Sequence, residues 1–234
     1  MSKLAVVTGG TKGIGRAIVE EFASLKFDIA TCSRHHEDLE VLKSHLAKTF
    51  SVRTHSIVAD LSVRDQVRKF SDFVTGLGQP VDVLVNNAGF FAPGQIMEEK
   101  EGALEALIEA NVYSAYHLTR GLCPAMKAEK AGHIFNMCSI ASIKAYPNGG
   151  SYAISKFALL GFSKVLREEL KEFNIRVTAV LPGATRTGSW DGVQLPDERF
   201  IMPRDVAKAV AGAWSLSPQS VVEEIIIRPQ LGDI

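Results

Sequence analysis

Two kinds of hydrophobic pattern alternate along the chain. Short apolar runs rich in β-branched residues predict strands, and longer amphipathic stretches predict helices. The predicted strands are Leu4–Thr8, Asp28–Cys32, Val52–Val58, Val81–Val85, His133–Cys138, Arg176–Leu181 and Glu224–Ile227. The predicted helices include Ile14–Leu25, Leu39–Lys48, Arg64–Leu77, Ala103–Cys123 and Tyr152–Phe173.

This alternation predicts the fold class. Strands that are buried on both faces are continuously apolar, as Val81–Val85 nearly is. Strands joined through helices form a parallel sheet with helices on both faces, because the crossovers are right-handed. We therefore expect an α/β protein with one Rossmann-type, doubly wound, seven-stranded parallel sheet, in a single domain spanning residues 1–234.

The least regular stretch is Pro182–Pro203, which has few periodic signals. Loops of this length in compact domains are usually functional or mobile. We expect residues 183–203, approximately, to form a substrate loop that becomes ordered when cofactor binds.

Composition limits the possible partners. Of 234 residues, 46% are hydrophobic and 22% are charged, which is ordinary for a globular protein. Lys and Arg number 26, as do Asp and Glu, so the net charge of zero favours neither nucleic acid nor an anionic membrane. The apolar run Leu4–Val7 is too short for a signal peptide, and no run approaches the roughly 18 apolar residues of a membrane span. The expected location is the cytoplasm.

The three cysteines, Cys32, Cys123 and Cys138, lie in apolar stretches. An odd number without close spacing matches neither a disulfide framework nor a zinc site. We expect buried thiols in a reducing compartment, and no metal.

A glycine-rich turn joins the first predicted strand to the first predicted helix. Thr8–Gly15 reads Thr-Gly-Gly-Thr-Lys-Gly-Ile-Gly. Its glycines let the backbone approach a pyrophosphate, and the helix N-terminus offers free N–H groups and a positive dipole end. The Gly-Lys-Ser/Thr ending of a P-loop nucleotidase is missing. The turn therefore indicates a dinucleotide site, with a purely structural turn as the alternative.

The end of the second predicted strand indicates which dinucleotide binds. NAD sites usually place an Asp or Glu there, but this strand ends in Ser33-Arg34, and Glu37 and Asp38 match first-turn positions of the next helix. Arg34 is suited to hold a 2′-phosphate in bidentate fashion, and Lys12 adds a second cation on the same side. NADP(H) is therefore favoured over NAD(H). The alternative is that both cations are solvated surface side chains.

Candidate catalytic groups begin with Tyr152 and Lys156, which lie four residues apart on one face of a predicted helix. A tyrosine pKa of about 10 is too high for proton exchange at neutral pH. A neighbouring ammonium lowers that pKa, which is the tuning a general acid–base needs. Ser139 and Asn86–Gly89 follow two other strands, at the carboxyl ends where such sheets build their sites. The alternative for Ser139 is a turn or cap, and for Asn111, in a mainly apolar helical stretch, a bond to the backbone.

Together these motifs resemble the short-chain dehydrogenase/reductase family. The match covers positions 8–187, about three-quarters of the chain, and its complete order is far more specific than any single motif. The matching residues are the Thr8–Gly15 loop, Asp60, Asn86–Gly89, Asn111, Ser139, Tyr152, Lys156, Pro182, Gly183 and Thr187.

The resemblance implies a catalytic role for four residues. Tyr152 would give a proton to the substrate oxygen in reduction and remove it in oxidation, while Ser139 orients that oxygen. Lys156 would bond the nicotinamide ribose and lower the Tyr152 pKa. Asn111 would hold a water that links Lys156 to solvent.

The resemblance also implies the cofactor site. The glycine loop would hold the pyrophosphate, Asp60 and Leu61 the adenine, Asn87–Gly89 the adenosine ribose, and the segment at Pro182 the nicotinamide end. The full predicted set is Gly9, Thr11, Lys12, Gly13, Ile14, Gly15, Ser33, Arg34, Asp60, Leu61, Asn87, Ala88, Gly89, Tyr152, Lys156, Pro182, Gly183, Thr185 and Thr187.

The substrate pocket is less determined. Residues close in sequence to the catalytic motifs suggest an apolar or aromatic lining made of Phe91, Ile140, Tyr146, Ala184 and Trp190. Lys144 and Arg186 are weaker candidates for binding a substrate carboxylate. The C-terminal segment Ile225–Ile234 lacks the glycine-rich ending usual in ketoacyl reductases and looks more like that of the family's small reductases.

The sequence thus predicts an oxidoreductase that moves a hydride between NADP(H) and a small carbonyl or alcohol. A 3-oxoacyl thioester substrate remains open, as does a non-catalytic redox sensor or scaffold, although a pure binder has no need for the full catalytic set. Long apolar faces on Ala103–Cys123 and Tyr152–Phe173 resemble the family's subunit contacts, so we expect a homodimer or homotetramer.

Overall fold

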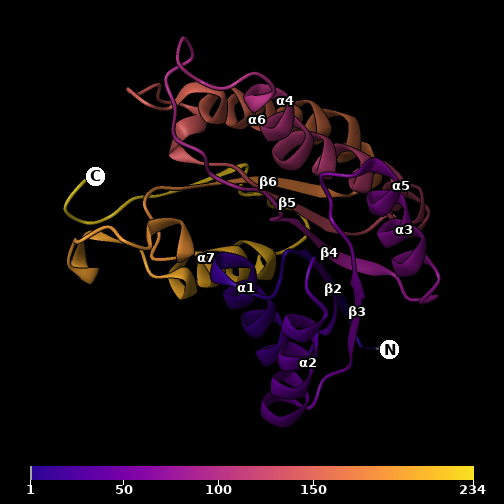
Figure 1. The fold of residues 1–234 in the computed structure, drawn as a ribbon. Coiled ribbons are helices and arrows are strands. Elements are labelled where there is room, and N and C mark those ends of the chain that lie inside the picture. Colours follow the sequence, from indigo (N-terminus) through magenta and orange to yellow (C-terminus); the bar gives the residue numbers. More distant parts are fainter. Residues whose placement is uncertain (1) are drawn as a thin grey trace.

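The computed structural model describes residues 2–234 and places seven parallel strands in one sheet (Figure 1). Across the sheet their order is β3-β2-β1-β4-β5-β6-β7. The chain winds one way from β1 and the other way from β4, and ligands of doubly wound sheets bind at such a switch point. The predicted fold class is confirmed. The strands are β1 (Leu4–Thr8), β2 (Asp28–Ser33), β3 (Thr54–Val58), β4 (Val81–Asn86), β5 (His133–Met137), β6 (Arg176–Pro182) and β7 (Glu224–Ile227).

Helices cover both faces of the sheet (Figure 1). Helices α1, α2 and α7 lie on one face, and α3, α4, α5 and α6 on the other. Their bounds are α1 (Gly13–Ser24), α2 (His36–Phe50), α3 (Arg64–Thr75), α4 (Ala103–Ile108), α5 (Ser114–Glu129), α6 (Gly150–Leu170) and α7 (Pro203–Ser215).

Strand β1 illustrates why the strand sequences are continuously apolar. Successive side chains of a strand point to opposite faces. Leu4 and Val6 pack in the core beneath α3, α5 and α6, whereas Ala5 and Val7 pack in the core beneath α1 and α7. Because both faces are covered, every position of the strand must be apolar.

The predicted helix Ala103–Cys123 is interrupted. Helix α4 ends at Ile108, a π-helical segment covers Glu109–Tyr113, and α5 begins at Ser114. A π turn inserts an extra residue into a helix and is frequent at functional sites. Hydrophobic periodicity did not indicate this break.

Other boundaries differ by a few residues. Strand β3 begins at Thr54 instead of Val52, β5 ends before Cys138, and α2 begins at His36. The early start of α2 puts Glu37 and Asp38 in its first turn, as predicted. Carboxylates there complement the positive end of the helix dipole.

The segment between β6 and α7 is irregular, as predicted, but it is closed at its base. Thr185 and Ile201 form an isolated parallel bridge, in which Arg186 N donates to Ile201 O and Ile201 N to Ala184 O, both at 2.9 Å. Two 3₁₀ turns lie between them, Gly188–Trp190 and Asp197–Arg199.

The three cysteines are free and buried, as predicted. Among residues 2–234, no helix combines the length and apolar character needed to cross a bilayer. The same residues contain no group of three or more His, Cys, Asp or Glu side chains arranged to bind a metal ion.

Candidate active site

The carboxyl ends of the strands meet at one edge of the sheet, because all seven strands are parallel. The loops after β1 and β4 are joined directly: Thr8 Oγ1 accepts hydrogen bonds from Asn87 N at 2.9 Å and from Ala88 N at 2.8 Å. Asn87 Nδ2 in turn donates to Thr8 O at 2.9 Å. The predicted cofactor residues of these two loops therefore form one unit at the switch point.

The glycine loop has no room for side chains. A Cβ atom added to Gly15 would lie 2.3 Å from Gly9 O and 2.4 Å from Asn87 Nδ2. A Cβ atom on Gly13 would lie 3.2 Å from Thr187 Cγ2, so the loop after β6 also reaches this point. These contacts explain why the loop requires glycine.

The N-terminus of α1 is open to an anion. Lys12 occupies the N-cap position and makes no side-chain cap bond, and the first turn carries no acidic residue. The N–H groups of Gly13, Ile14 and Gly15 therefore have no helical or side-chain partner, and the helix dipole adds positive potential there. A pyrophosphate matches such a site.

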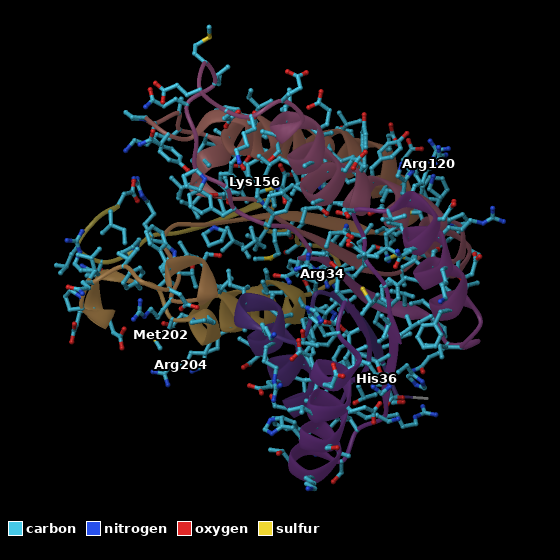
Figure 2. All side chains as sticks on the ribbon, in the orientation of Figure 1. Arg34, His36, Arg120, Lys156, Met202 and Arg204 are labelled. Carbon is cyan, nitrogen blue, oxygen red and sulfur yellow. The ribbon has the colours of Figure 1, made fainter. Side chains whose placement is uncertain are left out.

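The two predicted 2′-phosphate cations differ. Arg34 is exposed after β2 (labelled in Figure 2) and makes no hydrogen bond or ion pair with the described residues. Lys12 Nζ lies 2.8 Å from Asp38 Oδ2, with the lysine side chain 74% exposed. Such an exposed pair is weak. Arg34 is thus free to bind a phosphate, whereas Lys12 must first leave Asp38.

The predicted adenine residues also differ from each other. Asp60 closes a turn, because its Oδ1 accepts from Ser62 N at 3.0 Å and from Ser62 Oγ at 2.8 Å. The Leu61 side chain packs in the hydrophobic core. Ser33 Oγ lies 3.4 Å from Thr11 Oγ1, which links the loops after β1 and β2.

The residues predicted at the nicotinamide end are mostly engaged with one another. Pro182 ends β6, and Gly183 N donates to Ile227 O at 2.8 Å. Thr185 is buried and donates through Oγ1 to Gly183 O at 3.0 Å. Thr187 is the one beside the glycine loop.

Asn111 lies in the π-helical segment and is buried. Its side chain accepts from Phe90 N at 2.9 Å and donates to Phe90 O at 3.2 Å and to Ser155 Oγ at 3.0 Å. Ser155 Oγ donates onward to Tyr152 O at 2.7 Å. Asn111 thus ties the segment after β4 to α6, partly through the backbone bonds that were the alternative interpretation from sequence.

Tyr152 and Lys156 occupy the same face of α6. Lys156 is buried, extends from α6 toward the sheet (Figure 2) and donates to Met137 O at 2.8 Å. Its Nζ lies 5.7 Å from the centre of the Tyr152 ring. Burial lowers the pKa of Lys156 to about 8.

The Tyr152 pKa moves against expectation. Burial raises it above the ordinary value of 10.0, and a hydrogen bond with the Ser139 side chain acts in the opposite direction. The predicted lowering by Lys156 is wrong for this structure, because the ammonium is directed at Met137 O. Tyr152 is therefore protonated at neutral pH.

Ser139 also caps the short turn that follows it. Its Oγ accepts from Ala141 N at 3.1 Å, and its N donates to Ser142 Oγ at 3.1 Å, forming a capping box on the 3₁₀ turn Ile140–Ser142. The cap interpretation is confirmed. The hydroxyl proton of Ser139 is not used by these bonds, so it can serve the hydrogen bond with Tyr152.

Two of the predicted pocket residues lie at Tyr152. The Phe91 ring meets the Tyr152 ring edge to face, with centres 4.8 Å apart. Burial raises the pKa of Tyr146, and the electrostatic influence of Tyr152 adds to this rise. Trp190 packs instead against Phe200, with ring centres 5.3 Å apart.

The remaining pocket candidates are held elsewhere. Ile140 is buried in the turn after Ser139, and Ala184 pairs with Ile201 through its backbone. Both candidate carboxylate-binding cations are already paired: Lys144 Nζ lies 3.5 Å from Asp233 Oδ2, and Arg186 Nε lies 3.0 Å from Asp197 Oδ1.

Sequence reasoning missed several polar residues that hold the site. Thr31 Oγ1, buried on β2, accepts from Gly10 N at 3.2 Å, and Ser155 joins Asn111 to α6. Glu99 bonds to Ser151 at the start of α6. Thr31 is a polar residue in an otherwise apolar part of its strand, which is a signal that could have indicated it; Ser155 shares the buried side of α6 with Ser151, Lys156 and Ser163, so no such signal singles it out.

Comparison with known proteins agrees with this geometry. The family model described as short chain dehydrogenase matches residues 3–196. The sepiapterin reductase of Chlorobaculum tepidum is 34% identical over 250 residues, covering 100% of this chain and 99% of its own length. A metagenomic short-chain oxidoreductase in complex with NADP superposes with a TM-score of 0.85 at 32% identity, covering 97% of both chains. An alcohol dehydrogenase from Thermococcus sibiricus complexed with 5-hydroxy-NADP gives a TM-score of 0.92 at 27% identity, covering 98% of this chain and 97% of its own.

Proposed function

Because the chain belongs to the short-chain dehydrogenase/reductase family of oxidoreductases, we propose that it transfers a hydride between NADP(H) and a small carbonyl or alcohol, with Tyr152 as general acid–base. One observation carries the proposal: on one face of α6, the buried Lys156 places its Nζ 5.7 Å from the centre of the Tyr152 ring and donates to Met137 O at the end of β5.

The residues at this edge fit a nicotinamide dinucleotide. The unpaired N–H groups of Gly13, Ile14 and Gly15 would hold the pyrophosphate. Arg34, which is free of other partners among residues 2–234, would hold a 2′-phosphate. The two NADP-type complexes among the similar structures support this choice over NAD(H).

The protein's part of the reaction is proton transfer and orientation. The bound dinucleotide supplies or accepts the hydride. The Ser139 hydroxyl would donate a hydrogen bond to the substrate oxygen and fix its position beside Tyr152. The Tyr152 hydroxyl, protonated at neutral pH, would donate its proton to the carbonyl oxygen during reduction and accept one back during oxidation.

Lys156 would act through the cofactor. With a pKa of about 8, its ammonium is mostly charged at neutral pH. It would hold the nicotinamide ribose and so orient the dinucleotide toward the substrate oxygen beside Tyr152. Asn111, joined to Tyr152 O through Ser155, would hold the proton-relay water near Lys156.

The substrate is proposed to be small and uncharged. Phe91 and Tyr146 give the surroundings of Tyr152 an aromatic character. Lys144 and Arg186 are both in ion pairs, which disfavours a substrate carboxylate. The full-length likeness to a sepiapterin reductase makes pterins one class to test, and 3-oxoacyl thioesters are the alternative.

We propose that the protein forms a homodimer or homotetramer through α6. Ile154, Phe157 and Val165 lie exposed along this helix, and Tyr113 is exposed in the π-helical segment nearby. A second copy would cover this apolar face. A monomer by light scattering at micromolar concentration would contradict the proposal.

The function is tested by Tyr152→Phe in an NADPH-oxidation screen over diketones, β-keto esters, pterins, aldehydes and 3-oxoacyl thioesters. The variant should bind NADPH as the wild type does and lose turnover by roughly 10²–10⁴-fold. Unchanged turnover would refute the mechanism. A wild type that binds NADPH and turns over none of these compounds would favour the redox sensor or scaffold.

A further inference from the structure

The segment after β4 is attached to the start of α6 by a partly buried contact. Glu99 Oε1 accepts from Ser151 N at 2.9 Å, and Ser151 Oγ donates to Glu99 Oε2. Ser151 is 4% exposed and directly precedes Tyr152. The Glu99–Ser151 contact therefore fixes both the backbone and the side chain of the residue next to Tyr152.

The N-terminus of helix α6 has no acidic residue of its own to stabilise it. Gly149 at its N-cap makes no side-chain cap bond, and its first turn contains no acidic residue. The unpaired N–H groups and the positive dipole end at a helix N-terminus are stabilised by a negative charge. Glu99 supplies this charge from a distant part of the chain.

The backbone at Gly150 is shaped around the contact. Its φ is +38°, and an added Cβ atom would lie 2.1 Å from Glu99 Oε1 and 2.5 Å from Gly94 O. Gly94 N also donates to Asn148 O at 3.0 Å. Residues 90–102, which we call the β4–α4 segment, thus rest directly on the turn that leads into α6.

Few other contacts hold the β4–α4 segment. It projects at the top of the molecule in Figure 1, and Met97 at its tip is 93% exposed. A cavity of about 470 Å³ lies between the segment and α4, with Phe90, Pro93, Glu98, Ala103, Leu107 and Asn148 in its lining. Polar contacts therefore hold the segment at two places: Asn111 binds the backbone of Phe90 at its start, and residues 148–151 hold Gly94 and Glu99 further along.

The β4–α4 segment also carries the residue that covers Tyr152. Phe91 meets the Tyr152 ring edge to face, with ring centres 4.8 Å apart. Without the Glu99 contact, this ring would be held in place mainly by the bonds of its neighbour Phe90 to Asn111 and would move more freely over Tyr152. The space for the substrate beside Tyr152 therefore depends on a contact several residues away.

We infer that Glu99 is a positioning residue that sets the size of the accepted substrate: by holding the β4–α4 segment on α6, it keeps Phe91 against Tyr152 and restricts access to small carbonyl compounds. This inference rests on the proposed function of Tyr152. Glu99 itself touches neither the substrate nor the reacting atoms.

The test compares Glu99→Ala with Glu98→Gln, a matched control at the neighbouring exposed carboxylate. For each protein, kcat/KM is measured with NADPH for one small and one bulky ketone from the screen. The small-to-bulky ratio should fall about tenfold in Glu99→Ala, a change typical of altered pocket size, and should match the wild type in Glu98→Gln. A partly unfolded sample does not change this ratio, because the active fraction cancels.

A second measurement needs no turnover. Hydrogen exchange of the free protein should accelerate in residues 90–102 and in the first turn of α6 for Glu99→Ala, but not for Glu98→Gln. Adding Ser151→Ala to Glu99→Ala should change the ratio no further, because both substitutions remove one contact. Glu99→Gln keeps an acceptor for Ser151 N and should give an intermediate small-to-bulky ratio. This variant takes the place of Glu99→Ala if Glu99→Ala does not fold.

An unchanged substrate ratio, or unchanged exchange in the β4–α4 segment, overturns the inference whatever happens to the melting temperature. If Tyr152→Phe loses turnover while the ratio in Glu99→Ala stays the same, only the role of Glu99 is lost. If Tyr152→Phe keeps full turnover, the proposed function itself is wrong.

Discussion

The loops that follow β1 and β4 are in close backbone contact with each other, whereas the loop that follows β6 is closed at its base by a backbone bridge and held beyond it by side-chain contacts. On the first side, Thr8 Oγ1 accepts two backbone N–H bonds, and Gly15 leaves no space for a Cβ atom. On the second side, an exposed pair joins Arg186 Nε to Asp197 Oδ1 at 3.0 Å, and the Trp190 ring rests on Phe200. We call these the cofactor side and the substrate side.

The difference lies in how many residue types each arrangement allows. A backbone that approaches another backbone requires glycine, and a buried N–H pair requires a hydroxyl at one position. An exposed ion pair or an aromatic contact is satisfied by many residue types at many positions. We therefore expect the cofactor side to tolerate few substitutions and the substrate side to tolerate many.

The largest effect is expected from adding one methyl group on the cofactor side. Gly15→Ala places a Cβ atom against Gly9 O and Asn87 Nδ2, so the loop must shift. Overpacking of this kind costs about 2–3 kcal/mol, and NADPH should bind roughly 30–100-fold more weakly by fluorescence titration. Gly212→Ala on α7 is the control, because a Cβ atom there has no neighbour within 4 Å. Equal affinities for the two variants would remove the basis of the comparison.

A smaller effect is expected from the two cations. Arg34→Ala removes charged hydrogen bonds to the 2′-phosphate, worth about 2 kcal/mol, and should weaken NADPH binding roughly 30-fold while leaving NADH binding nearly unchanged. Lys12→Gln should change NADPH affinity much less, because Lys12 is already paired with Asp38. Titration of both cofactors checks this. A wild type that prefers NADH would show that Arg34 does not select the cofactor.

The pH dependence of kcat/KM tests whether catalysis requires the charge on Lys156, which lies between the cofactor side and the substrate side. Lys156 has a folded-state pKa of about 8, below its ordinary 10.5, so its ammonium is lost as pH rises through that value. The kcat/KM for reduction should be flat near neutral pH and then decline up to about tenfold per unit above pH 8. The profile is measured at low substrate concentration on protein shown to stay folded. A rate that stays constant to pH 10 would show that the charge on Lys156 is not required.

The smallest effect is expected on the substrate side. Arg186→Ala breaks an ion pair in which Asp197 is exposed, and such pairs contribute about 0.5 kcal/mol or less. The melting temperature and the NADPH affinity should therefore remain close to those of the wild type. A loss of stability as large as that of Gly15→Ala would mean that the substrate side is as tightly built as the cofactor side.

The same contrast explains what the sequence could predict. The strands could be predicted because both faces of the sheet are buried. The glycine loop after β1 could be predicted because only glycine fits it. Tyr152 and Lys156 were found together because helical spacing places them on one face. The sequence did not predict the surroundings of these two residues, because their burial and the bond from Lys156 to Met137 O depend on residues that the fold brings near.

The features that the sequence did not predict are contacts between side chains far apart along the chain. Nothing in a local pattern pairs Lys12 with Asp38, turns Trp190 toward Phe200, or brings Glu99 to Ser151. Such contacts have no period in the sequence, and each partner is an ordinary surface residue by type. A single chain without relatives aligned to it offers no signal for them.

The π-helical segment Glu109–Tyr113 has a consequence for insertions and deletions. An α-helix turns by about 100° for each residue, so one extra residue offsets the phase of everything that follows it. Deleting one residue there would let α4 and α5 join as a regular helix, but it would rotate Asn111 away from Phe90 or carry Thr119 away from Asn86. The chain length of this stretch is therefore as constrained as the identity of its residues.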